Sequence, residues 1–302
     1  MSILRTKRIR GAAIMLALWA LFLLSALVIA WALDIKSRLA ISGEGTRMLK
    51  AEAVACSGVE VALHPSTKPG SPNLDGQLDG GATYHARLTG EGGRIDLNWV
   101  ASGPGPVEVL RRYLENKGID LNERDLMIDA LLDWVQPGTG LHRLNAPEES
   151  DDYHPAHAPL TRVDELKKVA GWAEFTSVPA WDDDFTVNTR QGIDPQWASR
   201  NVLLALPGVT KEMVDRFIQL RQGPDQIDGT EDDVQFKSVN DFLSAIGFNP
   251  QNAQQVQALQ GLLVPSSSVY RVVSIGTAGK ATRTVQMVFN RQGPQLLTWK
   301  EF

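Results

Sequence analysis

The pattern of hydrophobic and polar positions divides the chain into parts of different character. Residues 12–33 form a run of 22 residues without a charge or a proline. At about 1.5 Å per residue, such a run makes a helix of roughly 33 Å, long enough to cross a hydrocarbon core of about 30 Å. Residues 99–265 then show the spacing of short amphipathic helices, and residues 266–302 show strand-like alternation. The pattern predicts a membrane span followed by a mixed α and β body.

The segment between the span and the helical region contains three predicted elements. Residues 34–63 continue the helix, which we expect to kink at Gly43 and Gly45. Residues 64–81 are rich in Pro, Gly, Ser and Asp and predict a loop. Residues 82–99 predict a β-hairpin with "GEGG" as its turn. One broad face of this helix is predicted to be shared by Leu39, Met48, Leu49, Ala53, Cys56 and Val59.

The helical region is predicted to hold at least seven short helices, from residue 106 to residue 263, and no strand. Asn122, Asp194 and Ser238 are the expected N-caps, and Thr161 with Asp164 is close to a capping box. After this region, two strands around Gly279 and a third over residues 295–302 are predicted.

These elements together predict an α+β fold. Strands lie before and after the helical region, and no Pro-, Ser- or Gly-rich linker flanks it. The simplest architecture is one antiparallel sheet packed on the membrane-proximal helix, with a large all-α insertion between strands. A separate all-α domain is the less favoured alternative.

Charges on either side of the apolar run predict its orientation. The leader carries Arg5, Lys7, Arg8 and Arg10 and no acid, whereas Asp34 follows the run. The positive-inside rule then keeps the N-terminus in the cytoplasm and places residues 34–302 across the membrane. The "AWA" at 30–32 offers a signal-peptidase site, so cleavage near Ala32 stays an alternative, although a signal peptide normally has a shorter apolar core.

Composition narrows the function classes. The net charge of −5 argues against nucleic acid as a partner. The single cysteine cannot form an internal disulfide. No Ser-centred nucleophile elbow, Walker loop or dinucleotide fingerprint is present, so an enzyme is not predicted. The five histidines, which lack a helical zinc-binding spacing, are His64, His85, His142, His154 and His157.

The order of segments resembles the type IV pilin class, and several motifs resemble one family within it, the minor pseudopilin K of type II secretion systems. The motifs are "RGAAIMLALW" at 10–19, "GRIDLN" at 93–98, "IDALLDWV" at 128–135, "EESDDYHP" at 148–155, "GPDQIDGTEDD" at 223–233 and "TWKEF" at 298–302. The resemblance covers nearly the whole chain.

That resemblance implies a domain plan. Residues 1–11 would be a prepilin leader and 12–33 the transmembrane helix. Residues 34–98 and 266–302 would form the pilin-like domain. Residues 99–265 would be the insertion, with two SAM-like halves of about 99–186 and 187–265.

It also implies how the N-terminus is processed. Prepilin peptidase would cut after Gly11, and Ala12 would become the N-methylated mature terminus. Most pilins have glutamate as the fifth mature residue, where this chain has Leu16, in keeping with family K. A carboxylate in a bilayer costs about 2.5 to 3.5 kcal/mol unless it is paired, and a subunit at a filament tip has no neighbour above it to pair with. The omission therefore suits a tip subunit in the inner membrane, with partner pseudopilins resembling I and J.

Acidic clusters raise the question of a bound metal. They lie at 148–152, 182–184 and 225–233. None fits an EF-hand loop, since Val239 stands twelfth from Asp228. Members of the resembling family bind calcium in the helical insertion, so we expect structural calcium. The expected ligands are Glu148, Glu149, Asp151 and Asp152. A solvated acidic loop is the alternative.

One motif in the insertion resembles a helix-hairpin-helix, "LPGVTKEMVDRFIQLR" at 206–221. Thr210 replaces the usual second glycine and the surroundings are acidic, so a structural SAM-like role is predicted rather than phosphate binding.

The sequence thus predicts a non-catalytic minor pseudopilin at the tip of the type II secretion pseudopilus, which takes part in export of folded proteins across the outer membrane. The first alternative is a membrane-anchored periplasmic calcium-binding or interaction protein without a filament role. The second, a secreted or anchored hydrolase, needs an active site that no motif supplies.

Overall fold

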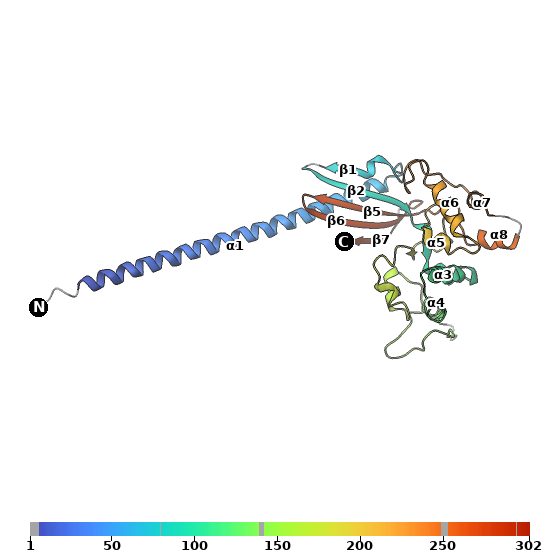
Figure 1. Cartoon of the computed structure of the whole chain (residues 1–302), viewed down its shortest axis with the longest axis horizontal. Coiled ribbons are helices and arrows are strands. Elements are labelled where there is room, and N and C mark those ends of the chain that lie inside the picture. The colour runs from blue at the N-terminus through green and yellow to red at the C-terminus, as the bar shows by residue number, and fades with distance from the viewer. Residues whose placement is uncertain (1–5, 79, 139–141, 249–252, 294) are drawn as a thin grey trace.

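The molecule consists of one long helix with a body at its far end (Figure 1). The structure is a computed structural model of the 302-residue chain, and it describes residues 6–78, 80–138, 142–248, 253–293 and 295–302. The predicted α+β class is confirmed: a long N-terminal helix packs on an antiparallel sheet, and a mostly helical insertion lies between two strands.

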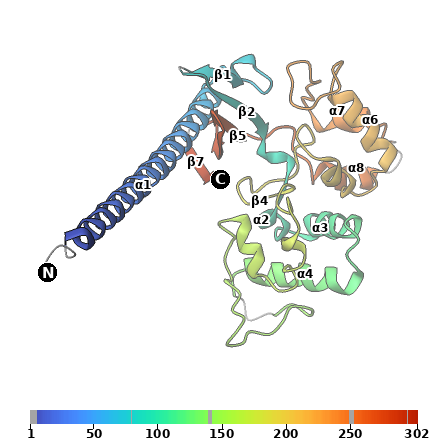
Figure 2. The ribbon, with the colours of Figure 1, turned by 60° about the vertical axis from the view of Figure 1, so that its left-hand side comes forward.

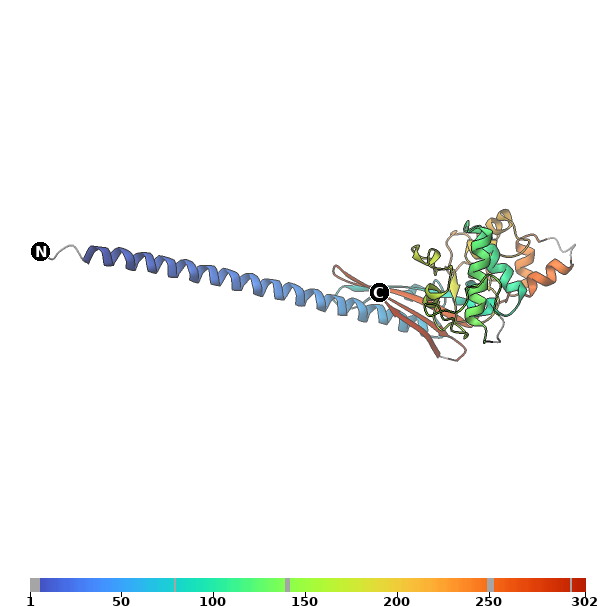
Figure 3. The ribbon, with the colours of Figure 1, turned by 90° about the horizontal axis from the view of Figure 1, so that it is seen from below.

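The long helix, α1, runs without interruption over Thr6–Leu63. The kink predicted at Gly43 and Gly45 is wrong, because both residues are helical. A glycine in a helix costs about 1 kcal/mol, which is too little to break a helix that is held at one end by a sheet. Most of α1 stands clear of the body, and its last part, which includes the buried Ala51 and Ala62, lies along the sheet (Figure 3).

The face of α1 that contacts the sheet is made of small residues. Of the six residues predicted to share a face, Val59 is buried and Cys56 is half-buried, whereas the other four are exposed. A Cβ at Gly276 of the sheet would lie only 2.0 Å from the carbonyl oxygen of Ala51, so the helix backbone itself touches the sheet. Hydrophobicity favours large side chains, whereas this contact excludes them. The buried face is Ala51, Val54, Ala55, Gly58, Val59 and Ala62.

The sheet has five strands in the order β1-β2-β5-β6-β7, and every neighbouring pair is antiparallel. The predicted strands around Gly279 and the predicted last strand are confirmed. The strands are β1 Asp75–Leu78, β2 Ala82–Gly90, β5 Val269–Ala278, β6 Ala281–Asn290 and β7 Gln295–Glu301.

The predicted hairpin around "GEGG" is wrong. β2 pairs with β1, which lies in the predicted loop, and with β5, which lies about 180 residues further along the chain. Residues Ile95–Asp96 form β3, which pairs in parallel with β4 (Phe185–Thr186) outside the main sheet. Gly90 has an ordinary φ of −69°, and neither Gly92 nor Gly93 has a positive φ, so the backbone conformation does not require glycine in this segment.

The insertion lies between β2 and β5 and beyond the membrane-distal end of α1 (Figure 2). One cluster of buried hydrophobic side chains extends through it from Ile95 to Leu263, across the predicted boundary between two SAM-like halves, which stays a prediction. Its helices are α2 Leu97–Val100, α3 Pro104–Asn116, α4 Leu121–Val135, α5 Arg200–Leu204, α6 Lys211–Arg221, α7 Val239–Ala245 and α8 Ala253–Gln260, with 3-10 turns at Val163–Lys168 and Phe175–Ser177. Two further 3-10 turns, Pro72–Leu74 and Glu91–Gly93, flank β1 and β2.

Several predicted helix starts are shifted. Asp120, not Asn122, caps α4, and Ser199, not Asp194, caps α5. The segment with the predicted capping box, Thr161 with Asp164, is a 3-10 turn, and Glu165 rather than Asp164 accepts the hydrogen bond from the backbone of its N-cap, Arg162. The predicted cap Ser238 is confirmed, since its hydroxyl accepts a hydrogen bond from the backbone of Asp241 at 3.1 Å.

Candidate functional site

The exposed apolar half of α1 is the most unusual surface of the molecule. Residues 12–33 are exposed throughout, and Leu16, at 71% exposure, contacts almost nothing. The helix is long and apolar enough to cross a membrane. Soluble proteins rarely leave such a surface in water, so it must be covered by lipid or by other apolar helices.

The end of this surface is marked by charge pairs along the helix. Asp34 pairs with Arg38 at 2.9 Å, and Glu44 pairs with Arg47 at 2.8 Å. Both pairs are exposed and contribute little to stability. They indicate that the uncharged run ends at Asp34, where α1 begins to carry charged side chains.

The predicted processing site lies at the free end of α1. Gly11 and Ala12 are both exposed, and no atom lies within 4 Å of the position that a Cβ on Gly11 would occupy. Residues 1–5, which include the basic Arg5, lie outside the described residues. Cleavage after Gly11 and methylation of Ala12 therefore stay predictions.

The predicted calcium ligands lie on an exposed loop after α4. Ser150 and Tyr153 exchange two backbone hydrogen bonds of 3.0 and 3.2 Å and close a tight turn. Glu149 accepts a hydrogen bond from His157 at 2.8 Å, which raises the pKa of that histidine. The four predicted ligands, all exposed, are Glu148, Glu149, Asp151 and Asp152.

The four carboxylates are not gathered into a set of ligands in this structure. Calcium takes six to eight oxygen ligands. Among the described residues, no group of three or more His, Cys, Asp and Glu side chains is placed so that it could hold a metal ion. Calcium binding at the four carboxylates stays a prediction, and nothing in the function proposed below depends on it.

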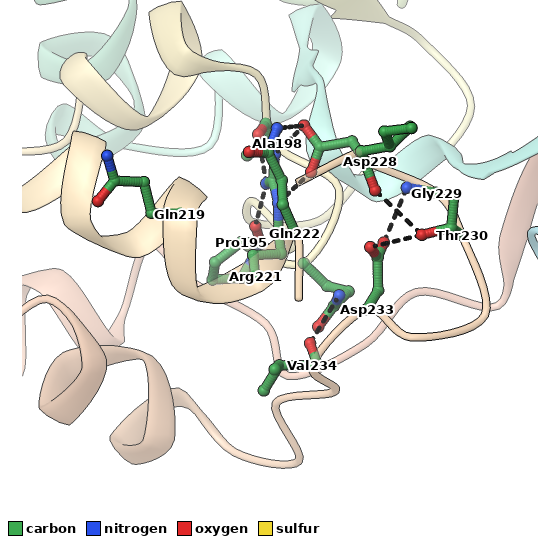
Figure 4. Close-up of polar contacts among 12 residues, drawn as sticks. Pro195, Ala198, Gln219, Arg221, Gln222, Asp228, Gly229, Thr230, Asp233 and Val234 are labelled. Carbon is green, nitrogen blue, oxygen red and sulfur yellow. Dashed lines mark hydrogen bonds and ion pairs between the residues drawn. The ribbon is translucent and has the colours of Figure 1, made fainter. Parts of the chain in front are cut away.

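The second acidic loop, residues 223–233, is closed by its own contacts (Figure 4). Arg221, only 5% exposed, binds both oxygens of Asp228 at 2.9 and 3.0 Å and donates to the backbone oxygens of Pro195 and Ala198. The backbone of Gly229 donates to Asp233 at 2.8 Å. These carboxylates therefore fix the loop to α6.

The histidines are not gathered into one site. His64 contacts Ser66, and His85 contacts Asp75 on the sheet. His142 lies 3.4 Å from the carboxylate of Asp133, while His157 contacts the backbone oxygen of the same residue at 3.0 Å.

The burial of one charged residue, Glu91, was not predicted from the sequence. Glu91, between β2 and β3, is completely buried. It accepts two hydrogen bonds of 2.7 Å from Arg271 and one of 2.6 Å from Thr186. Burial alone would raise the pKa of Glu91, but Arg271 and Arg94 outweigh burial and hold it below its ordinary value. In the sequence, Glu91 stands among glycines, a composition typical of a surface turn. Nothing in the sequence therefore indicates that its carboxylate is buried.

Comparison with known proteins identifies the fold. No protein-family profile matches the chain, and no curated protein sequence matches it. The chain is similar to one chain of the crystal structure of the GspK–GspI–GspJ complex from the enterotoxigenic Escherichia coli type 2 secretion system. The TM-score is 0.60 at 15% sequence identity, and the match covers 89% of this chain and 99% of that chain. At this identity the likeness establishes the fold, insertion included.

Proposed function

We propose that this chain is a minor pseudopilin at the tip of the type II secretion pseudopilus, where it takes part in export of folded proteins across the outer membrane. Its role is structural, without catalysis. The observation that carries the proposal is α1: its first half is apolar and exposed, and the last part of the same uninterrupted helix packs on the sheet through small residues. The similarity in fold to a chain of the GspK–GspI–GspJ complex supports it.

The exposed half of α1 anchors the chain in the inner membrane as a single span. The basic residues before it favour a cytoplasmic N-terminus. The body, which begins after Asp34, then lies in the periplasm.

Partner subunits would contact α1 between the membrane and the sheet. Leu39, Ile41 and Leu49 are 69%, 70% and 68% exposed there, although they lie beyond the apolar run. Apolar side chains at these positions are best covered by the helices of neighbouring subunits. We infer that these subunits resemble GspI and GspJ, which share the complex of the similar chain.

A position at the tip agrees with two features. The insertion lies at the end of the molecule opposite the free end of α1 (Figure 3), where it would obstruct a subunit stacked above. Leu16 replaces the glutamate that would pair with such a neighbour.

The test is the mature N-terminus of protein taken from native membranes, determined by mass spectrometry. We expect a methylated Ala12, produced by prepilin peptidase, and we expect Gly11→Ala to abolish both the cut and secretion. Gly45→Ala, a glycine substitution further along the same helix, is the control and should be processed normally.

Two other results would contradict the proposal. An intact Met1 would favour a membrane-anchored periplasmic binding or interaction protein without a filament role. A start near Leu33 would indicate a secreted protein.

A further inference from the structure

The segment Gly90–Arg94, here called the connector, carries the chain from the sheet into the insertion. A flexible link between two bodies is normally exposed and polar. The connector is buried from residue 90 to residue 93. A Cβ at Gly90 would lie 2.1 Å from the ring of Trp197, and one at Gly93 would lie 2.2 Å from the Trp197 backbone. Its glycines therefore allow the insertion to close directly on the connector.

The buried carboxylate of Glu91 joins three elements at this point. Arg271 of β5 binds both of its oxygens, and Thr186 of β4 donates to it at 2.6 Å. Arg94 of the connector adds a contact of 3.1 Å. One charge thus contacts the sheet, the insertion and the segment that links them.

The segment that leads from the insertion back into β5 is held to the connector through Asp194. The Asp194 backbone donates to the carbonyl of Gly92 at 2.8 Å. The Asp194 carboxylate accepts from the backbone of Ser267, just before β5, at 3.1 Å. Both crossings between sheet and insertion are therefore held by groups that contact the connector.

We infer that Glu91 is the positioning residue of a rigid joint, so that the sheet and the insertion move as one body and α1 sets the direction in which the insertion points. Any other orientation would separate a buried carboxylate from its arginine partners, which is strongly unfavourable. The joint depends only on contacts within the chain, so it does not require that the chain lie at the tip of a pseudopilus.

The experiment measures distances between two spin labels on the full-length chain in nanodiscs by pulsed dipolar spectroscopy. The labels are placed on cysteines introduced as Lys280→Cys, in the turn of the sheet, and Asn122→Cys, on α4, with Cys56→Ser removing the native thiol. Both sites are exposed. With Glu91 intact, we expect one narrow distance distribution. Glu91→Gln should broaden the distribution and shift its maximum.

The matched control is Asp215→Asn, which removes the exposed pair of Asp215 with Arg200 (2.8 Å) within the insertion. It should leave the distribution unchanged. If Glu91→Gln does not fold, the double variant Glu91→Met with Arg271→Met removes the carboxylate together with the arginine that binds both of its oxygens, while Arg94 keeps its hydrogen bond to the carbonyl of Asp183; this variant should fold with a broadened distribution.

A broad distribution in the protein with Glu91 intact would overturn the inference without any variant. So would a folded Glu91→Gln or double variant whose distribution stays as narrow as that of the parent. The distance measurements do not depend on secretion. A result that contradicts the rigid joint therefore leaves the proposed function untouched, and the reverse also holds.

Discussion

Buried carboxylates organise the parts of the insertion that lack regular structure. Glu91, Asp96, Asp184 and Asp194 are each at most 8% exposed. Each accepts hydrogen bonds from segments distant in sequence. Asp184, for example, accepts from Tyr113 at 2.9 Å and from Ser199 at 2.6 Å. A buried polar group of this kind favours the one arrangement in which its hydrogen bonds are satisfied.

The two carboxylates at the joint respond to pH in opposite directions. The pKa of Glu91 is lowered, so its contribution is present above the ordinary pKa of a glutamate and is lost as the pH falls through the folded-state pKa. Burial raises the pKa of Asp194 to about 7 from 3.8. The folded chain therefore holds a proton on Asp194 that the unfolded chain has released.

Asp194→Asn should change how stability depends on pH. Between about pH 4 and about pH 7, Asp194 is ionised in the unfolded chain but protonated in the folded chain, so the free energy of unfolding falls as the pH rises, by up to about 1.4 kcal/mol per pH unit. Asparagine does not ionise, so the variant should lack this part of the slope. The measurement is thermal unfolding in detergent, followed by circular dichroism across that range.

Glu44→Gln is the control, because Glu44 lies exposed on α1 and its loss should leave the slope unchanged. An Asp194→Asn slope equal to that of the parent would show that Asp194 is ionised in the folded chain throughout this range.

At the scale of elements, α1 combines two unlike surfaces on one continuous helix. Its first half exposes large apolar side chains, and its last part presents small ones to the sheet. Gly58 and Gly276 lie where helix and sheet approach most closely. The first surface suits lipid and other helices, whereas the second suits only this sheet.

Two glycine substitutions on α1 should have opposite effects. A Cβ at Gly58 would lie 2.3 Å from the hydroxyl of Ser274 and 2.8 Å from the ring of Tyr84, so Gly58→Ala should destabilise the fold by about 1 to 3 kcal/mol. A Cβ at Gly45 would meet nothing within 4 Å. Gly45→Ala should therefore stabilise the helix, by up to about 1 kcal/mol.

The measurement is the free energy of unfolding of the two variants and the parent, determined with denaturant in the same detergent. If Gly58→Ala were at least as stable as Gly45→Ala, the helix and the sheet would not be in the close contact described above.

At the scale of the whole molecule, the insertion is added to the sheet without interrupting it. β2 and β5 are neighbouring antiparallel strands, and Gly90 stands opposite Tyr270 where the chain leaves and re-enters the sheet. The two ends of the insertion therefore lie side by side.

Replacing residues 91–269 by Asn-Gly should leave a folded anchor and sheet. Gly90 and Tyr270 are already cross-strand neighbours, and Asn-Gly favours the two-residue turn that joins such strands. We expect strand signal in circular dichroism and a chain that stays in the membrane fraction. We also expect processing at Gly11 but no support of secretion.

Full secretion by this shortened chain would contradict a tip role for the insertion. Aggregation would show that the sheet needs the insertion to fold.

The sequence by itself determined the elements that rest on local patterns. The 22-residue apolar run, the β5–β6 hairpin around Gly279 and the capping box at Ser238 follow from neighbouring residues, and each is present in the structure. The candidate processing site, Gly11, is likewise a local motif. The fold leaves it exposed and does not test it.

Tertiary structure alone decided the pairing of β2 with β5, the small-residue face of α1 and the burial of Glu91. In each case the deciding contact joins segments far apart in the chain. Glycine at 90 and 93 is required by Trp197, about 100 residues away, and not by a turn. Local periodicity carries no information about such approaches, because their free energy depends on which surfaces meet after the chain has folded.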